Sequence, residues 1–114
     1  MAIGVDIEDI NRFENKSQEF LDRIYTKKEQ EYCLSKPNPA SHFAVRFCAK
    51  EAVIKALNSI DISHPRLNQI EIFHDEKKYP KVKLLTNVNY DLIIEVSLSH
   101  DKTKAIAFVT INKN

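Results

Sequence analysis

Glycine is almost absent from this sequence, because Gly4 is the only one among 114 residues. Phosphate-binding loops of the dinucleotide and P-loop kinds need several glycines, since their backbone must approach the phosphates closely. Cysteine is also scarce. Cys33 and Cys48 are too few and too isolated to predict a disulfide framework or a zinc site, so we expect reduced thiols. Any phosphate bound by this protein must therefore be held by side chains and a metal ion.

Net charge and long apolar runs are lacking as well. The chain has 17 Lys and Arg against 16 Asp and Glu, a formal charge of +1. This balance, without a basic aromatic platform, argues against a nucleic-acid-binding domain. No apolar run approaches the roughly 20 residues of a membrane span, and the N-terminus lacks the layout of a secretion signal. We expect a cytoplasmic protein with no nucleic-acid or membrane partner.

The apolar pattern predicts one α+β domain over residues 1–114, because 43% hydrophobic content at this length suits one modest core. Helices grouped before a run of strands predict an antiparallel sheet packed against a long central helix and shorter helices. The expected helices cover 17–25, 26–34 and 39–58, and the expected strands cover 2–7, 70–74, the vicinity of 82–84, 92–98 and 105–111.

Local signals define several of these boundaries. Thr26 and Glu29 have the spacing of a capping box, and Asn38 is a plausible N-cap with a proline behind it. Residues 7–13 indicate a turn or short helix. Residues 99–103 are expected to form a hairpin loop between the last two strands.

Two carboxylates and a lysine suggest chemistry. Glu51 and Lys55 lie four residues apart on the central helix, a spacing that most often gives a solvated ion pair. Asp6 lies at or near a strand end, where an acid is usually a turn former or helix cap. Taken together, two carboxylates and a phosphate-pairing cation are the parts of a magnesium-assisted phosphoryl-transfer site.

Three segments together resemble one known family. They are 4–12 (GVDIEDINR), 46–57 (RFCAKEAVIKAL) and 96–100 (VSLSH), the last followed by an alanine-containing strand around 105–107. The second segment has the form R-F-x-x-K-E-A-x-x-K-A and is the most specific. In motif order and separation the sequence is similar, from end to end, to the holo-acyl-carrier-protein synthases, the small trimeric type of 4'-phosphopantetheinyl transferase.

The resemblance implies an enzyme that transfers 4'-phosphopantetheine from its substrate, coenzyme A, to a serine of an apo acyl carrier protein. Adenosine 3',5'-bisphosphate would be released, and the holo carrier would support fatty-acid biosynthesis. By motif match, Asp6 and Glu51 would hold Mg²⁺ on the coenzyme pyrophosphate, and Lys55 would pair with that pyrophosphate and assist the departing phosphate. Either a metal-held water or one of the two carboxylates could take the serine proton.

The same match predicts further coenzyme contacts. Arg46 and Lys50 would address phosphates of coenzyme A, although Arg46 could equally pair with an acid at a subunit boundary. His100 would contact the coenzyme's phosphates or nucleotide; without the family it would be an ordinary loop histidine. Ser59 and Pro80 complete the expected coenzyme-binding set.

The sequence departs from the family beside both of these last residues. Segment 58–60 (NSI) stands where the family has Gly-Thr-Gly, and 78–79 (KY) precedes Pro80 where the family has Gly-x-Pro. Asparagine tolerates a left-handed backbone and Ser59 keeps a hydroxyl, but the close approach that glycine permits is lost. We expect these changes to reshape the coenzyme pocket.

The resemblance also implies protein partners. The family's usual carrier protein is strongly acidic, so a local basic surface is expected to steer it. Arg12 and Arg23 match positions of the family's docking region, although Glu19 and Asp22 dilute the positive charge there. Each arginine would otherwise be an ordinary solvated charge.

A homotrimer with active sites between neighbouring subunits is implied too. Asp6 with His100 and the helix bearing Glu51 could then come from different chains, and an exposed apolar sheet face would favour such assembly. The competing hypothesis is a non-catalytic module that binds coenzyme A or a carrier protein. Retention of Asp6, Glu51 and Lys55 favours the enzyme, since binding alone would not require all three.

Overall fold

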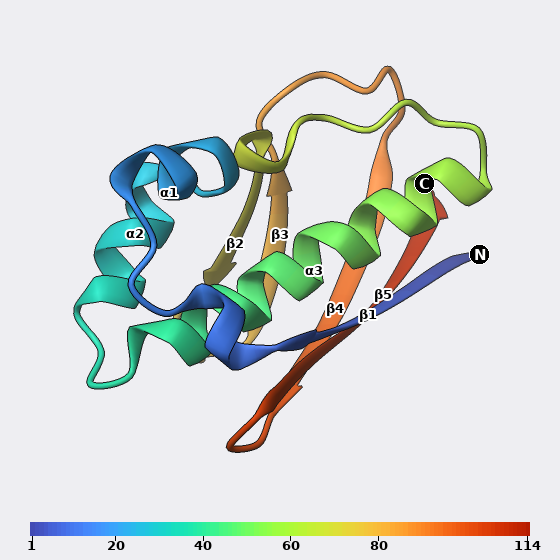
Figure 1. Cartoon of the computed structure of the whole chain (residues 1–114). Helices are drawn as coiled ribbons and strands as arrows, with labels where there is room; N and C mark the ends of the chain where they lie inside the picture. Colours follow the sequence, from blue (N-terminus) through green and yellow to red (C-terminus); the bar gives the residue numbers. More distant parts are fainter.

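The computed structural model describes residues 1–114 and contains two antiparallel sheets. The strands were predicted to form one sheet, but β3 and β4 share no hydrogen-bonded ladder and only lie beside each other (Figure 1). The larger sheet has the order β1-β5-β4, with β1 at Ala2–Asp9, β4 at Leu92–His100 and β5 at Lys104–Lys113; the smaller pairs β2 at Ile70–His74 with β3 at Pro80–Leu84.

The helices lie on one side of the larger sheet. The longest, α3 at Pro39–Ser59, crosses the sheet face, and α1 at Gln18–Ile24 and α2 at Lys27–Leu34 lie near its N-terminal half (Figure 1). Short 3-10 helices cover Ile10–Phe13 (η1) and Leu67–Gln69 (η2). The predicted α+β architecture is confirmed. No helix combines the length and the apolar character that crossing a bilayer requires.

The core lies between α3 and the larger sheet, where small side chains meet. On β5 every second residue from Ala105 to Ile111 is buried, and these residues face α3. On α3 the residues Ala49, Ala52 and Ala56 are fully buried. Because both surfaces carry small side chains, the helix and the sheet approach each other closely.

The capping box predicted at Thr26 and Glu29 forms, whereas the N-cap predicted at Asn38 does not. Ser17 Oγ accepts a hydrogen bond from the Phe20 amide at 3.1 Å and begins α1. The capping box of α2 is complete: Thr26 Oγ1 accepts from the Glu29 amide at 3.2 Å, and Glu29 Oε1 accepts from the Thr26 amide at 2.9 Å. Asn38 precedes α3, but its side chain makes no capping hydrogen bond.

All three strands of the larger sheet are longer than predicted, and β5 exceeds its expected bounds at both ends. β1 continues to Asp9 because its pairing with β5 extends as far as Lys104, so only Ile10–Phe13 forms the expected helical turn. Glu8 is therefore a strand residue on the same side of β1 as Asp6. β4 likewise continues through His100, which makes His100 a strand-end residue rather than a loop residue.

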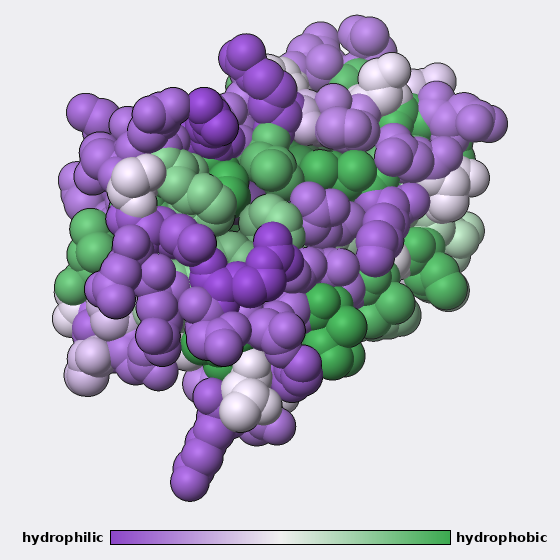
Figure 2. Space-filling model, viewed as in Figure 1, coloured by the Kyte–Doolittle hydropathy of each residue, from purple (hydrophilic) through white to green (hydrophobic).

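The outer face of the larger sheet is apolar and exposed along β1 and β5. It carries Ile3, Val5 and Ile7 from β1 together with Ile106 and Phe108 from β5, all of them exposed. Register places Val5 opposite Phe108 and Ile7 opposite Ile106. Hydrophobic side chains gather along β1 in the space-filling view (Figure 2). A contiguous exposed stripe of this kind is typical of an interaction surface.

Candidate functional site

Gly4 sets the separation between β1 and α3. A Cβ atom at this position would lie 2.0 Å from the backbone oxygen of Ala52, far inside van der Waals contact. Only glycine therefore permits the observed approach of strand and helix. Asp6, two residues further along the same side of β1, is thereby brought against the turns of α3 that carry Glu51 and Lys55. We call Asp6, Glu8, Glu51 and Lys55 the carboxylate site.

Asp6 and Lys55 form the direct contact between strand and helix. Lys55 Nζ lies 3.2 Å from Asp6 Oδ1 and donates to the backbone oxygen of Val5 at 2.9 Å. The Lys55 side chain is 54% exposed, whereas that of Asp6 is only 12% exposed. The second carboxylate oxygen of Asp6, Oδ2, is buried without a hydrogen-bond donor. Asp6 thus keeps one acceptor atom free for another cation.

The acids of this site repel one another. Burial raises the pKa of Glu51, the Asp6 charge raises it further, and the Lys55 ammonium opposes both effects. Burial also raises the pKa of Glu8 to about 7, with a further increase from Asp6 and an opposing effect of Arg12, its ion-pair partner. The folded chain therefore concentrates more negative charge here than Lys55 and Arg12 compensate.

Asp6 and Glu51 fit a hydrated divalent cation. No three His, Cys, Asp or Glu side chains lie close enough to enclose a metal on their own. Mg²⁺ is usually held by one or two protein carboxylates and completes its octahedral shell with waters and substrate phosphate oxygens. The unpaired Oδ2 of Asp6 and the mutual repulsion of the acids are what such a cation would relieve.

A second group of residues gathers around Arg46, and of its members only Arg46 and His100 were predicted. Arg46 is 1% exposed, and its Nη2 atom lies 3.4 Å from Nδ1 of His74. The His42 and His100 rings lie 6.5 Å apart, and the Tyr32 ring stacks on His74 with ring centres 5.4 Å apart. We call these five residues the histidine cluster.

Sheet register explains how the carboxylate site and the histidine cluster are separated. His100 on β4 stands opposite Ala105 on β5, which stands opposite Glu8 on β1. The two outer positions are two strand spacings apart, about 10 Å. Because residues in one row project to the same side, Glu8 and His100 both face the α3 side of the sheet.

Lys50 requires a correction, since it was predicted to address coenzyme phosphates. Its side chain is 0% exposed, and Nζ donates to Glu29 Oε1 at 2.7 Å, to the Leu67 carbonyl at 2.9 Å and to the Ile70 carbonyl. All three ammonium donors are used, so none is available to a phosphate. Burial lowers the pKa of Lys50, and the Glu29 carboxylate opposes that shift. Lys50 joins α3 to α2 and β2.

Ser59 and Pro80 lie outside both groups. Ser59 is one turn beyond Lys55 on α3, but its hydroxyl donates to the Ala56 carbonyl at 2.7 Å. Pro80 begins β3 and lines a cleft against β4. The left-handed backbone expected near residue 58 occurs instead at Asp61, where φ is 58°. Asn58 remains helical because α3 continues to Ser59.

The two predicted docking arginines have different surroundings. Arg12 pairs with Glu8 of the carboxylate site, and its guanidinium carbon lies 5.5 Å and 5.9 Å from the ring centres of Phe13 and Phe47. Arg23 pairs with Glu19 at 2.8 Å, and both side chains are exposed on α1. Only Arg12 therefore connects the outer surface to the acids.

Comparisons with known proteins agree with this arrangement. Residues 2–109 match the family described as the 4'-phosphopantetheinyl transferase superfamily. The chain is 40% identical to a holo-[acyl-carrier-protein] synthase of Cytophaga hutchinsonii, covering 99% of this chain and 98% of the relative. Against the Chlamydia caviae synthase the identity is 44%, covering 92% and 91% of the two chains. The chain belongs to the holo-[acyl-carrier-protein] synthase family.

A solved member of that family has the same fold. The crystal structure of the Helicobacter pylori holo-[acyl-carrier-protein] synthase in complex with coenzyme A superposes with a TM-score of 0.79 at 30% identity, covering 96% of this chain and 99% of that one. The family resemblance allowed Asp6 and Glu51 to come from different chains. In this structure a single synthase chain brings both carboxylates together.

The family motifs leave several site residues unnoticed. Glu8 was placed in a turn, although the alternation of β1 puts it on the same side as Asp6. Tyr32, His42 and His74 carried no motif signal at all. They come from α2, α3 and β2, and only the packing of these elements brings them to Arg46.

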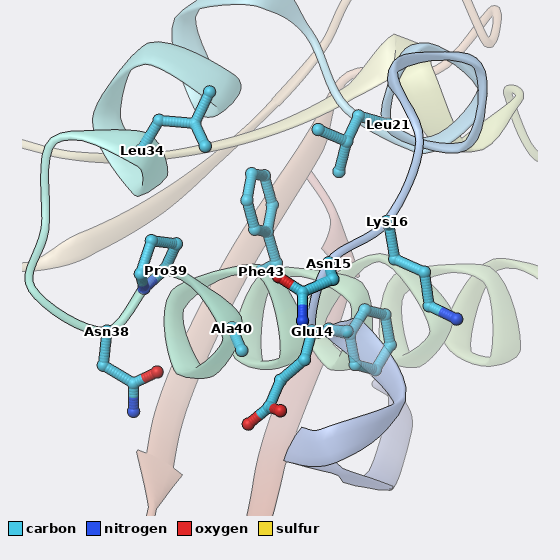
Figure 3. A pocket seen from close by; sticks show the side chains of 10 residues that line it. Glu14, Asn15, Lys16, Leu21, Leu34, Asn38, Pro39, Ala40 and Phe43 are labelled. Carbon is cyan, nitrogen blue, oxygen red and sulfur yellow. The ribbon is translucent and has the colours of Figure 1, made fainter.

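An apolar groove lies apart from both groups, among η1, α1, α2 and the start of α3. Its volume is about 270 Å³, and Leu21, Leu34 and Phe43 project toward it (Figure 3). Glu14 and Lys16 lie at its edge. None of the predicted site residues lines this groove, so we assign it no part in the site.

Proposed function

We propose that this chain uses Asp6, Glu51 and Lys55 to transfer the 4'-phosphopantetheine group of coenzyme A to a serine of an apo acyl carrier protein. The reaction releases adenosine 3',5'-bisphosphate and supplies holo carrier for fatty-acid biosynthesis. One observation supports these roles above all: contact of Gly4 with Ala52 brings the strand carboxylate and the helix carboxylate of the matched motifs together in one chain.

Asp6 and Glu51 are the proposed ligands of Mg²⁺. When bound there, Mg²⁺ would supply positive charge to the pyrophosphate of coenzyme A. Lys55 is placed to pair with the same pyrophosphate, because its side chain is 54% exposed and its ammonium is held at Asp6. It then stabilises negative charge on the departing bisphosphate. The serine proton passes to a carboxylate or to a bound water.

Arg46 and His100 are proposed to hold the nucleotide end of coenzyme A. Arg46 is buried beside a hollow, and its Nε atom has no hydrogen-bond partner. His100 lies on the rim of the same hollow. Ser59 and Pro80 stay predicted coenzyme contacts, whereas Lys50 is removed from that set because its donors are all used within the core.

Arg12 is the proposed docking residue for the acidic carrier. It is 57% exposed, and it lies over two aromatic rings beside the carboxylate site, where an incoming serine must arrive. Arg23 is a weaker candidate because Glu19 neutralises it on the surface. In a carrier titration, Arg12→Glu should raise the carrier KM roughly 10-fold or more through lost steering, and Arg23→Glu should raise it less. An equal effect of both reversals would remove the distinction.

A homotrimer is proposed to form through the apolar stripe on β1 and β5. The stripe holds Ile3, Val5 and Phe108 in contact with solvent in a single chain, and burial between copies would remove this apolar area from water. Sedimentation equilibrium should give three times the 13.2 kDa chain mass, and Val5→Lys should lower that value. A monomeric wild-type protein would contradict the proposal.

A mass assay tests the transfer itself. The protein is incubated with coenzyme A, Mg²⁺ and an apo carrier, and the intact carrier mass is followed. A gain of one phosphopantetheine group, dependent on Mg²⁺ and abolished by chelation, is expected. Failure to modify any authentic apo carrier, with coenzyme A binding retained, would support the non-catalytic binding module instead.

A further inference from the structure

Three imidazoles from three elements surround one buried guanidinium in the histidine cluster. His42 comes from α3, His74 ends β2 and His100 ends β4. Two hollows of about 260 and 150 Å³ share Tyr32, Arg46 and His74 among their lining residues. Neither the sequence motifs nor the family match gives His42 or His74 a function.

Arg46 has no acidic partner, although it is almost fully buried. Its guanidinium carbon lies 4.2 Å from the centre of the Tyr32 ring, its Nη1 atom makes a 3.4 Å contact with the His42 carbonyl, and Nε is unpartnered. No carboxylate forms an ion pair with it. A buried charge without a counter-ion is costly, so the cluster is suited to receive an anion.

Charged side chains of both signs surround the cluster, but none of the acids pairs with Arg46. Lys36 lies over the Tyr32 ring from the end of α2, and Lys28 and Lys78 line the larger hollow. Acids do line that hollow, but each is engaged. Glu29 accepts from Lys50, Glu71 accepts from Thr26, and Asp75 accepts from amides of its own turn.

The two histidines without an assigned function are neutral at ordinary pH when the cluster holds no anion. Burial lowers the pKa of His42 and that of His74, and the Arg46 charge lowers both further. Lys36 acts in the same direction on both rings, while Asp75 opposes the shift at His74. An anion within reach of these rings would favour their protonated forms.

We propose that His42 and His74, together with Arg46, form a site for a dianionic phosphate monoester, and that the site takes up protons when it is filled. This rests in part on the proposed function, because coenzyme A and adenosine 3',5'-bisphosphate both carry a phosphate monoester on the ribose. Free inorganic phosphate offers the same chemistry.

The direction of the pH effect follows from the charges. At pH 8 both imidazoles are neutral, so only Arg46 and the nearby lysines offer positive charge to the anion. As the pH falls toward 6.5, the bound anion stabilises imidazolium, so each proton gained on binding tightens affinity by at most a factor of ten per pH unit. We expect affinity to rise roughly 3- to 10-fold per pH unit over this interval.

Calorimetry with adenosine 3',5'-bisphosphate tests the proposal. Titrations at pH 6.5 and 8.0, in buffers of different ionisation heat, should show net proton uptake and the stated increase in affinity. The double variant His42→Gln, His74→Gln should lose both. His64→Gln is the matched control, because His64 contacts the Pro65 carbonyl outside the cluster, and it should behave as wild type. A pH-independent wild-type affinity, or an unchanged slope in the double variant, overturns the proposal.

Two further ligands identify the source of the phosphate. Dephospho-coenzyme A lacks the ribose phosphate monoester, so its affinity should not depend on pH if the coenzyme fills this site. Inorganic phosphate alone should show the pH slope if the site accepts a free anion. Absence of the slope with both inorganic phosphate and the bisphosphate would overturn the site.

Imidazole NMR of the wild-type protein keeps the test independent of variant folding. Addition of the bisphosphate should raise the pKa of His42 and His74 and leave the His64 resonances unshifted. Unshifted His42 and His74 resonances would overturn the proposal. Transfer activity at pH 8.0 is measured separately, so loss of the proposed function and loss of the proton-linked site give different results.

Discussion

The carboxylate site and the histidine cluster face the same side of one sheet, yet the chain builds them in opposite ways. The carboxylate site needs two elements, β1 and α3, held together by a single glycine contact. The histidine cluster needs α2, α3, β2 and β4 at once. The first site concentrates negative charge that a cation would relieve, and the second holds a buried arginine that has no acidic partner.

The two regions therefore use different parts of α3. Arg46 lies in its first half, and Glu51 and Lys55 lie in its second half, about 1.4 and 2.5 turns further along. Coenzyme A has a nucleotide at one end and its reacting pyrophosphate nearer the middle. The nucleotide could then lie at Arg46 while the pyrophosphate lies at Glu51 and Lys55. Substitutions that affect one region and spare the other test whether the two regions act independently.

Removing the charge of Glu51 should have the largest effect. We expect Glu51→Gln to lower the rate of carrier modification by at least about 10³-fold, because the proposed metal ligand is lost. Its thermal unfolding midpoint should not fall, since the substitution relieves repulsion with Asp6. The exposed acid Glu31 supplies the control variant Glu31→Gln, which should retain full activity.

The same variant separates the two regions. Glu51→Gln should bind adenosine 3',5'-bisphosphate with wild-type pH dependence, because the histidine cluster is untouched. Loss of that binding together with transfer would mean that the regions are not independent.

The sequence predicted the carboxylate site better than the histidine cluster, because the two regions are built from different numbers of elements. The motif around Glu51 and the lone Gly4 specified the carboxylate site, because residues within one helix turn and one strand have fixed spacing. The expected helices and strands formed for the same local reasons. His42 and His74 are 32 residues apart in the sequence, and they line one hollow only because the smaller sheet packs beside α3, which no local period encodes.

Lys50 shows the opposite error. Its motif position suggested a phosphate contact, but adjacent helix residues point about 100° apart, so Lys50 cannot share the face of Glu51. Its side chain projects into the interior, where Glu29 and two backbone carbonyls accept hydrogen bonds from its ammonium group. A motif thus identified an important residue and assigned it the wrong environment.

Substitution of Lys50 should disturb both regions together. We expect Lys50→Met to lower the free energy of unfolding by about 3 to 5 kcal/mol, because Glu29 is left as a buried unpaired charge. Urea unfolding measures this loss, and Lys83→Met on the exposed side of β3 is the control. Transfer and bisphosphate binding should decline in parallel with the folded fraction. An unchanged urea midpoint would show that the buried pair does not hold α3 in place.

The smallest expected effect is at Lys78, in the turn between β2 and β3 beside the histidine cluster. The backbone of Lys78 is in the left-handed region, with a φ of 71°. Asp75 Oδ1 stabilises this turn because it accepts hydrogen bonds from the amides of Lys77 at 2.9 Å and Tyr79 at 3.0 Å. Lys78→Gly removes the strain but adds backbone freedom to the unfolded chain. We expect a net gain of about 0.5 to 1 kcal/mol in thermal or urea unfolding.

Asn89→Gly is the matched comparison for this gain, because Asn89 has a φ of 65° but asparagine tolerates that conformation better than lysine. It should gain less stability than Lys78→Gly. Lys78→Gly also removes one cation from the larger hollow, so bisphosphate affinity should weaken less than 3-fold, while the pH slope carried by His42 and His74 persists. Loss of the slope in this variant would assign the proton linkage to Lys78 and its turn instead of the two histidines.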